Sequence, residues 1–296
     1  MTEGTLVRYA ARTPWRAYLE LTKPRVVALM VFTVAVGMLL ARPDLPPWSV
    51  MLGGTLGIAL VAGAAAAINH LIDRRIDALM ARTRARPLPS GTVGAAQAFA
   101  FAVTLGGAGV ALLIATTNPL CALLSVAALL GYAVVYSAYL KRATPQNIVI
   151  GGAAGAAPPL LGWVAVTGAV EPGALLLFTI ILLWTPPHFW ALAIHRRDDY
   201  ARAEVPMLPV THGIAFTSER IVHYSIATAL IALAPVAIGM SGWLYGLGAA
   251  AFGVRFVDMA LRLRREPRWA MPAFRYSIVY LFALFALLLG DHFLRG

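Results

Sequence analysis

The stretch MLGGTLGIALVAGAAAAI (residues 51–68) runs directly into NHLIDRRID (residues 69–77). The first part is almost wholly apolar and is long enough to cross a membrane as a helix. In the second part Asn69, Asp73 and Asp77 recur at four-residue intervals, and four residues rotate a helix by about 400°. We therefore predict a membrane helix whose end carries one amide and two carboxylates that face the same way. Intramembrane carboxylates are costly, so the default interpretation of this stripe is a functional site.

The composition predicts an all-α polytopic membrane protein with a single domain over residues 1–296. The chain is 60% hydrophobic and only 12% charged, which excludes a soluble domain of this length. The first apolar run follows a basic leader without a convincing cleavage site, so we interpret it as a retained helix and not as a signal peptide. Nine runs are candidate transmembrane helices: Val26–Leu40, Met51–Ile68, Val93–Ala115, Leu120–Tyr139, Ile148–Val166, Ala174–Ile194, Ile221–Met240, Trp243–Leu263 and Phe274–Phe293.

The basic residues predict the orientation. Of the 24 lysines and arginines, all but Arg42 and Arg295 lie before the first run or near the connections that follow the second, fourth, sixth and eighth runs. These segments are all on the same side of the membrane. The positive-inside rule then places the N-terminus in the cytoplasm and the C-terminus outside. The membrane that we expect is a cell inner membrane. The net charge of +11 follows from this topology, so the expected surroundings are a lipid bilayer and no nucleic-acid partner is expected. Cys121 is the only cysteine, which excludes an intramolecular disulfide and a cysteine metal cluster.

Two long loops, Asp77–Thr92 and His195–Arg220, are separated by four predicted helices. An even number of crossings returns the chain to the same side, so both loops are expected at the cytoplasmic mouth of the bundle. Long ordered loops in a compact protein are usually functional. The active site is therefore expected on the cytoplasmic side.

The first loop suggests a site for a metal ion and a phosphate. Carboxylates suit Mg²⁺, which prefers a few carboxylates together with substrate phosphates. Arg82, Arg84 and Arg86 follow the stripe, and guanidinium groups fork onto phosphate oxygens. The alternative is a capped helix end with solvated charges, and three residues at strict spacing argue against it.

Three other polar stretches have less specific patterns. His195 and Asp199 are four residues apart at a helix end, where a solvated face is the competing interpretation. Lys141 and Arg142 suit a phosphate and equally suit membrane anchoring. His188 follows Pro186 and Pro187, which we expect to break a membrane helix where it lines a cavity. Gly151, Gly152 and Gly155, followed by Pro158 and Pro159, predict a second close-packed or broken helix.

Together these stretches resemble a known family. The spacing NxxxDxxxD at residues 69–77 with RTRARPLP at residues 82–89 resembles the first aspartate-rich motif of the UbiA-type intramembrane prenyltransferases. Three further stretches are similar to the branch of that family that farnesylates protohaem. They are KRATPQNIVIGG (residues 141–152), WTPPHFWAL (184–192) and DYARAEVPMLP (199–209), and the likeness runs from LTKPR (21–25) to about Gly213.

The resemblance implies transfer of the farnesyl group of farnesyl diphosphate to a vinyl group of haem b, with addition of water. It implies Mg²⁺ as cofactor and nine helices in the UbiA-type bundle. An enzyme that modifies the product haem further is a candidate partner. The residues assigned to the metal and to catalysis are Asn69, Asp73 and Asp77, with Asp199 as a further metal ligand. The residues assigned to substrate binding are Arg82, Arg86, Lys141, Arg142 and Asn147, with His188 and His195 as candidates to position the haem.

One departure and two alternatives remain. The second motif of the family commonly has two aspartates four residues apart, whereas here Ala203 follows Asp199 and Arg202 follows Asp198. Whether one or two metal ions bind is therefore open. A UbiA-type transferase with another aromatic or chlorin acceptor is one alternative, and the stretch around His188 argues against it. A transporter is the other, and the lack of repeat symmetry argues against that.

Overall fold

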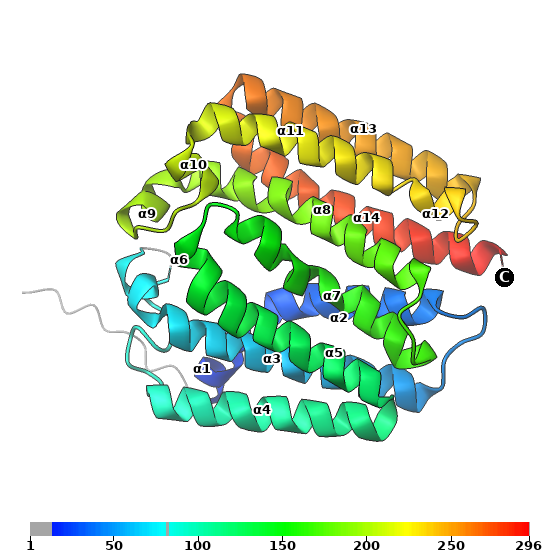
Figure 1. Cartoon of the computed structure of the whole chain (residues 1–296), viewed down its shortest axis with the longest axis horizontal. Coiled ribbons are helices and arrows are strands. Elements are labelled where there is room, and N and C mark those ends of the chain that lie inside the picture. Colours follow the sequence, from blue (N-terminus) through cyan, green and yellow to red (C-terminus); the bar gives the residue numbers. More distant parts are fainter. Residues whose placement is uncertain (1–13, 81–82, 296) are drawn as a thin grey trace, which may run out of the picture.

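The structure, a computed structural model, describes residues 14–80 and 83–295, and all regular secondary structure in these ranges is helical. Two groups of helices pack against each other (Figure 1). The first group contains α1 (Pro14–Leu21), α2 (Pro24–Leu40), α3 (Trp48–Leu79), α4 (Ala95–Thr116), α5 (Pro119–Leu130), the π-helix η1 (Gly131–Leu140), α6 (Lys141–Ala143) and α7 (Asn147–Thr167). The second contains α8 (Pro172–His195), α9 (Arg197–Arg202), α10 (Leu208–Thr211), α11 (Gly213–Ile231), α12 (Ala234–Ala237), α13 (Trp243–Arg265), the 3₁₀-helix η2 (Pro267–Trp269) and α14 (Ala270–Arg295).

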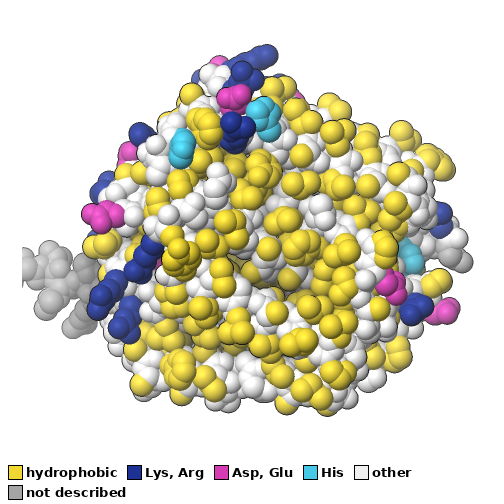
Figure 2. All heavy atoms as spheres, viewed as in Figure 1, with side chains coloured by type: hydrophobic (Ala, Val, Ile, Leu, Met, Phe, Trp, Pro, Cys, Tyr) yellow, Lys and Arg dark blue, Asp and Glu magenta, His cyan; other side chains and the backbone are white. Residues whose placement is uncertain are grey.

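The helices confirm a polytopic, all-α membrane protein. In the described ranges, eight helices are long and apolar enough to cross a membrane. A further candidate span consists of residues 15–21 of α1 together with α2, which meet at a bend of 54°, and counting it gives up to nine spans. Much of the surface in the middle of the bundle is hydrophobic (Figure 2). Leu52 and Leu247, for example, expose 66% and 64% of their surface. Such side chains are stable on the outside only where hydrocarbon surrounds them.

The longest helix, α3, carries the predicted stripe. It has 32 residues, which at about 1.5 Å per residue is about 48 Å, longer than the ~30 Å hydrocarbon core of a bilayer. The helix does not stop where the apolar run ends, at Ile68, but continues to Leu79 without a break. Asn69, Asp73 and Asp77 consequently share one helix face, as predicted.

The segments with functional motifs meet at one end of the bundle. Figure 1 shows α6, α9 and α10 at the same end as the turn between α3 and α4, and the C-terminus at the opposite end. Lysine and arginine side chains gather at the first of these ends (Figure 2). The two predicted loops therefore lie at the same end, although α11 begins at Gly213 and shortens the second loop from its expected end at Arg220.

The prediction that Pro186 and Pro187 break their helix is wrong, because α8 continues through both of them. Each proline removes a backbone donor, but neighbouring helices and hydroxyl groups compensate for such losses in membrane bundles. Here Thr185 Oγ1 donates to Ile181 O at 2.8 Å, just before the prolines. Burial between neighbouring helices thus keeps α8 helical despite its sequence.

Glycines allow α7 to pack closely, as predicted, but not at every position. A Cβ at Gly151 would lie 2.1 Å from the ring of Tyr136, and one at Gly152 would lie 3.0 Å from Thr185. A Cβ at Gly155 would meet nothing within 4 Å. Among the glycines of α7, Gly162 makes the closest approach to α2, since a Cβ there would lie 2.2 Å from Val34 O. Close backbone approach of this kind is typical of helix pairs in membranes.

We predict that Gly162→Ala destabilises the protein, because the added methyl group would force α2 away from α7. Overpacking of this kind costs about 1–3 kcal/mol. Thermal unfolding in detergent, followed by loss of the monodisperse peak, measures the effect. Gly155→Ala on the same helix is the matched control and should leave the melting temperature unchanged or raise it. Equal melting temperatures for the two variants would contradict the close packing.

Candidate active site

The stripe of Asn69, Asp73 and Asp77 on α3 is buried, with 2–3% of each residue exposed. Asn69 Nδ2 donates to Asp73 Oδ2 at 2.9 Å, which links the first two members along the helix. We refer to these three residues as the α3 stripe. Two carboxylates with so little access to water must be compensated by nearby cations or hydrogen-bond donors.

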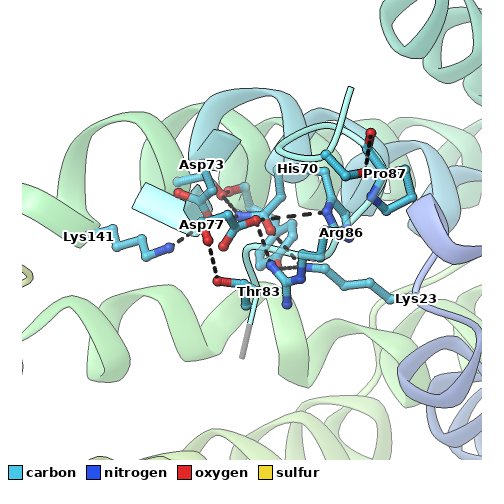
Figure 3. A network of polar contacts seen from close by, with 12 residues as sticks. Lys23, His70, Asp73, Asp77, Thr83, Arg86, Pro87 and Lys141 are labelled. Atoms are coloured by element: carbon cyan, nitrogen blue, oxygen red, sulfur yellow. Dashed lines mark hydrogen bonds and ion pairs between the residues drawn. The ribbon is translucent and has the colours of Figure 1, made fainter. Parts of the chain in front are cut away.

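Three cationic side chains from other segments reach the α3 stripe (Figure 3). Arg86 Nη1 donates to Asp77 Oδ2 at 2.7 Å. Lys141 Nζ donates to Asp73 Oδ2 at 2.6 Å. Lys23 Nζ donates to the amide oxygen of the stripe's asparagine at 2.5 Å. Every member of the stripe therefore has a cationic partner, which offsets much of the cost of burying the carboxylates.

The turn after α3 carries Arg86 back onto the helix that precedes it. Thr83 Oγ1 donates to Asp77 O at 2.9 Å, and Arg86 N donates to Thr83 O at 3.0 Å. Thr83 is itself 1% exposed, so this turn is fixed from inside the bundle. Arg84 is exposed. Arg82, which the sequence suggests for substrate binding, lies outside the described residues.

Lys23 is a site residue that the sequence analysis missed. It lies between α1 and α2, at the bend of that span, with φ of 52° and ψ of 58°. This left-handed conformation is uncommon for a residue with a side chain and is often a sign of function. Lys23 Nζ also donates to Tyr132 OH at 3.2 Å. A signal was present, because Lys23 and Lys141 are the only lysines in the chain, and both reach the same stripe.

The π-helix η1 supplies the other side of the cluster. Ser137 Oγ accepts from Asn69 Nδ2 at 2.7 Å and donates to Tyr132 O, five residues earlier, at 2.8 Å. π-helical turns are rare and occur frequently at functional sites. Nothing in the sequence indicated this one.

Several buried polar atoms at this end of the bundle have no hydrogen-bond partner among the described residues. They are Asp73 Oδ1, both ring nitrogens of His70 and Asn147 Oδ1. His70 is 2% exposed, and its Nδ1 lies 4.0 Å from Asp77 Oδ2. Since native proteins rarely leave buried polar atoms unpaired, these atoms are available to bind water or a ligand.

The donor set fits a hard divalent cation that is shared with a ligand. Within the described ranges, no group of three histidine, cysteine or acidic side chains is arranged to hold a metal by itself. Mg²⁺ does not need one, because it usually binds one or two carboxylates and completes its coordination with water and substrate phosphates. The unpartnered Asp73 Oδ1 is an oxygen ligand of the required kind, with Asp77 one helical turn away.

Neither His195 nor Asp199 forms an ion pair or a hydrogen bond with the α3 stripe in the described part of the chain. Asp199 forms ion pairs with Arg196, at 3.7 Å, and with Arg202. Asp198 and His195 are exposed. The metal-binding role of Asp199 and the haem-binding role of His195 therefore stay predictions.

Lys141, Arg142 and Asn147, which the sequence suggests for substrate binding, have different surroundings in the structure. Lys141 points into the bundle and pairs with Asp73, whereas Arg142 is exposed. Asn147 is fully buried at the start of α7, where its Nδ2 donates to Thr144 O at 2.8 Å. The structure thus joins Lys141 to the α3 stripe and leaves Arg142 at the surface.

His188 lies apart from this cluster, in the interface between α8 and α14. Its ring stacks on Trp184 with centroids 4.3 Å apart and on Phe274 with centroids 4.5 Å apart. Its Nδ1 is 2.7 Å from Ser277 Oγ. Its surroundings are aromatic and apolar, unlike those of the α3 stripe, so the two regions suit different kinds of ligand.

Sequence comparison identifies close relatives of this chain. The sequence profile of the UbiA prenyltransferase family matches residues 30–289. The chain is 60% identical over 285 residues to "Protoheme IX farnesyltransferase" of Azotobacter vinelandii, which covers 96% of this chain and 95% of the relative. It is 57% identical over 287 residues to the protein of the same name from Marinobacter nauticus, with coverage of 96% and 95%.

Structural comparison identifies the same type of fold. A structure of digeranylgeranylglyceryl phosphate synthase superimposes with a TM-score of 0.80 at 19% identity, and the match covers 94% of this chain and 98% of that one. A UbiA homologue from Archaeoglobus fulgidus bound to DMAPP and Mg²⁺ superimposes with a TM-score of 0.65 at 17% identity, with coverage of 92% and 98%. At such low identity these matches concern the fold alone.

Proposed function

The chain belongs to the UbiA prenyltransferase family, and we propose that it transfers the farnesyl group of farnesyl diphosphate to a vinyl group of haem b to form haem O. The observation that carries this proposal is the buried α3 stripe, with a cation on each member and the unpartnered Asp73 Oδ1. The near full-length identity to proteins named for protohaem farnesylation supports this acceptor. Membership of a prenyltransferase family argues against the transporter alternative.

The cations of the cluster are suited to hold a diphosphate. Lys23, Arg86 and Lys141 reach one buried region from three separate segments. Arg86 offers a planar fork to two phosphate oxygens, and each lysine offers a compact charge. When the diphosphate enters, these groups exchange part of their contact with the carboxylates for contact with the phosphate oxygens. They are therefore already in place for the charge that develops on the leaving group.

Asp73 and Asp77, with Asn69, would hold Mg²⁺. When bound, the ion supplies Lewis-acid neutralisation of the departing diphosphate. The carbon–oxygen bond of the allylic diphosphate then breaks, and the new carbon–carbon bond forms to the terminal carbon of the vinyl group. Water adds to the adjacent carbon and releases a proton. Burial of the stripe limits the access of bulk water to the site where the diphosphate leaves.

Several finer assignments belong to the same proposal. Asp199 is a candidate ligand of a second ion, because it lies on α9, at the same end of the bundle as the turn that follows the α3 stripe (Figure 1). His188 offers an aromatic, apolar surface suited to haem b. Arg142 and His195, both exposed, are candidates for contact with an incoming substrate. An enzyme that modifies haem O further would be the partner that receives the product.

We also propose nine spans in a cell inner membrane, with the N-terminus and the active site on the cytoplasmic side. The support is the distribution of lysine and arginine, together with the bent pair formed by α1 and α2. The positive-inside rule gives the direction.

The proposed reaction predicts that the purified protein converts haem b into a product heavier by one farnesyl group and one hydroxyl group, and releases diphosphate. Mass spectrometry of the haem and an assay of released diphosphate measure both products. Chelation with EDTA should abolish turnover, and Mg²⁺ or Mn²⁺ should restore it, because oxygen ligands select hard cations. Diphosphate release with another acceptor and none with haem b would refute the proposal.

We expect Asp73→Asn and Asp77→Asn to lower turnover by more than about 10³-fold, because each removes a charge that holds the metal during ionisation. Steady-state rates with both substrates measure the effect, and unchanged haem b binding verifies folding. Asp258→Asn is the control, since that carboxylate pairs with Arg255 and Arg262 on the exposed surface of α13. Near-normal turnover in either α3 variant would exclude these aspartates from catalysis.

The topology predicts which positions react with a membrane-impermeant thiol reagent. In a Cys121→Ala background, Arg84→Cys and Arg202→Cys should be labelled only in inside-out vesicles. Leu45→Cys, in the chain between α2 and α3, should be labelled only in right-side-out vesicles. All three positions are exposed, so accessibility depends on the side of the membrane. Labelling of Arg84→Cys from the outside would reverse the orientation.

A further inference from the structure

The imidazole of His188 is held on both faces and at one edge. Trp184 stacks on one side at an interplanar angle of 19°, and Phe274 stacks on the ring at 26°. Phe189 meets the ring almost at right angles, at 83°, with centroids 5.0 Å apart. The ring therefore has little freedom to rotate. The two ring nitrogens differ in hydrogen bonding, since only Nδ1 has a partner among the described residues.

The hydrogen bonds of Ser277 determine which nitrogen of His188 carries the proton. Ser277 Oγ donates its single hydrogen to Phe274 O at 2.6 Å. It must then accept at its contact with His188 Nδ1, which lies 2.7 Å away. Nδ1 is therefore the protonated nitrogen. Trp184 Nε1 donates to Ser277 O at 2.8 Å. Because Trp184 also stacks on His188, this hydrogen bond holds the serine backbone next to the histidine.

The other ring nitrogen is left with a lone pair. No carboxylate in the described part of the chain forms an ion pair with His188, and three aromatic rings surround it, so the neutral imidazole is the form present. A neutral imidazole protonated on Nδ1 has an unprotonated Nε2. No described residue forms a hydrogen bond with Nε2. Metal-binding histidines have this arrangement: one nitrogen donates to a fixed acceptor and the other binds the metal.

We propose that Ser277 is a positioning residue that holds His188 in the tautomer whose Nε2 can bind the iron of the acceptor haem. The inference rests on the proposed function, in which haem b is a substrate. The three aromatic rings around His188 make this surface apolar, which suits a hydrophobic macrocycle. Ser277 touches no substrate; it acts through His188, which would hold the macrocycle at α8 and α14, away from the cations that hold the diphosphate.

The test is spectroscopic. Purified protein titrated with haem b should give the optical and electron paramagnetic resonance spectra of a haem with axial nitrogen ligation, and His188→Gly should lose them. Added imidazole should restore nitrogen ligation in His188→Gly. Ser277→Ala should weaken haem b binding by about 10–100-fold, the usual cost of losing the hydrogen-bond partner of a metal-binding histidine, and should alter the spectrum. Affinity for farnesyl diphosphate should stay within about twofold, since no hydrogen bond or ion pair joins the described residues of the two regions.

Two further variants separate positioning from simple packing. Ser277→Thr keeps the hydroxyl group and should retain the wild-type spectrum. Ser225→Ala removes another fully buried hydroxyl group, which lies on α11 and has no hydrogen-bond partner among the described residues. This variant should change neither the spectrum nor the affinity for haem b. If Ser277→Ala does not insert, Ser277→Cys replaces it, because a thiol is a weak acceptor of nearly the same size.

The outcomes are distinct. A wild-type spectrum in Ser277→Ala or Ser277→Cys, or retained nitrogen ligation in His188→Gly, would overturn the inference while haem farnesylation by the wild type continued. Failure of the wild type to bind or convert haem b would overturn the proposed function and this inference together. An altered spectrum in Ser277→Ala, restored in Ser277→Thr, is the result we expect.

Discussion

The burial of two carboxylates inside a membrane bundle is the constraint on which the rest of the site depends. Moving a carboxylate out of water costs several kcal/mol even after relaxation, and hydrocarbon offers no compensation. Asp73 and Asp77 are therefore stable only because Lys141 and Arg86 reach them. The same pairing fixes the chain around the site, since each cation comes from a different segment.

That constraint accounts for local features that would otherwise be unfavourable. Lys23 adopts a left-handed conformation at the bend between α1 and α2, and in that position its ammonium group reaches the α3 stripe. The α-helix of α5 widens into η1, where Ser137 meets the stripe's amide. Strained or rare backbone geometry of this kind is retained where the surrounding contacts outweigh its cost. Here those contacts are the hydrogen bonds that Lys23 and Ser137 form with Asn69.

The bundle separates two chemical environments. One end carries the buried charges and the unpartnered oxygen of Asp73, suited to a metal-bound diphosphate. The interface of α8 with α14 carries stacked rings and one oriented imidazole, suited to a flat apolar molecule. An enzyme that joins a charged donor to a macrocyclic acceptor needs both environments.

The sequence by itself determined the all-helical membrane fold, the helical spacing of the α3 stripe and the shared end of the two loops. Hydropathy and helical periodicity act within one segment, so they can be read without knowing what packs against it. Only the tertiary structure decided that Lys23, Tyr132 and Ser137 join the stripe. It likewise decided that α8 continues through its prolines, and that His188 faces Ser277. These features depend on contacts between segments far apart in the chain, and the geometry of such contacts is set by helix packing, not by any local pattern.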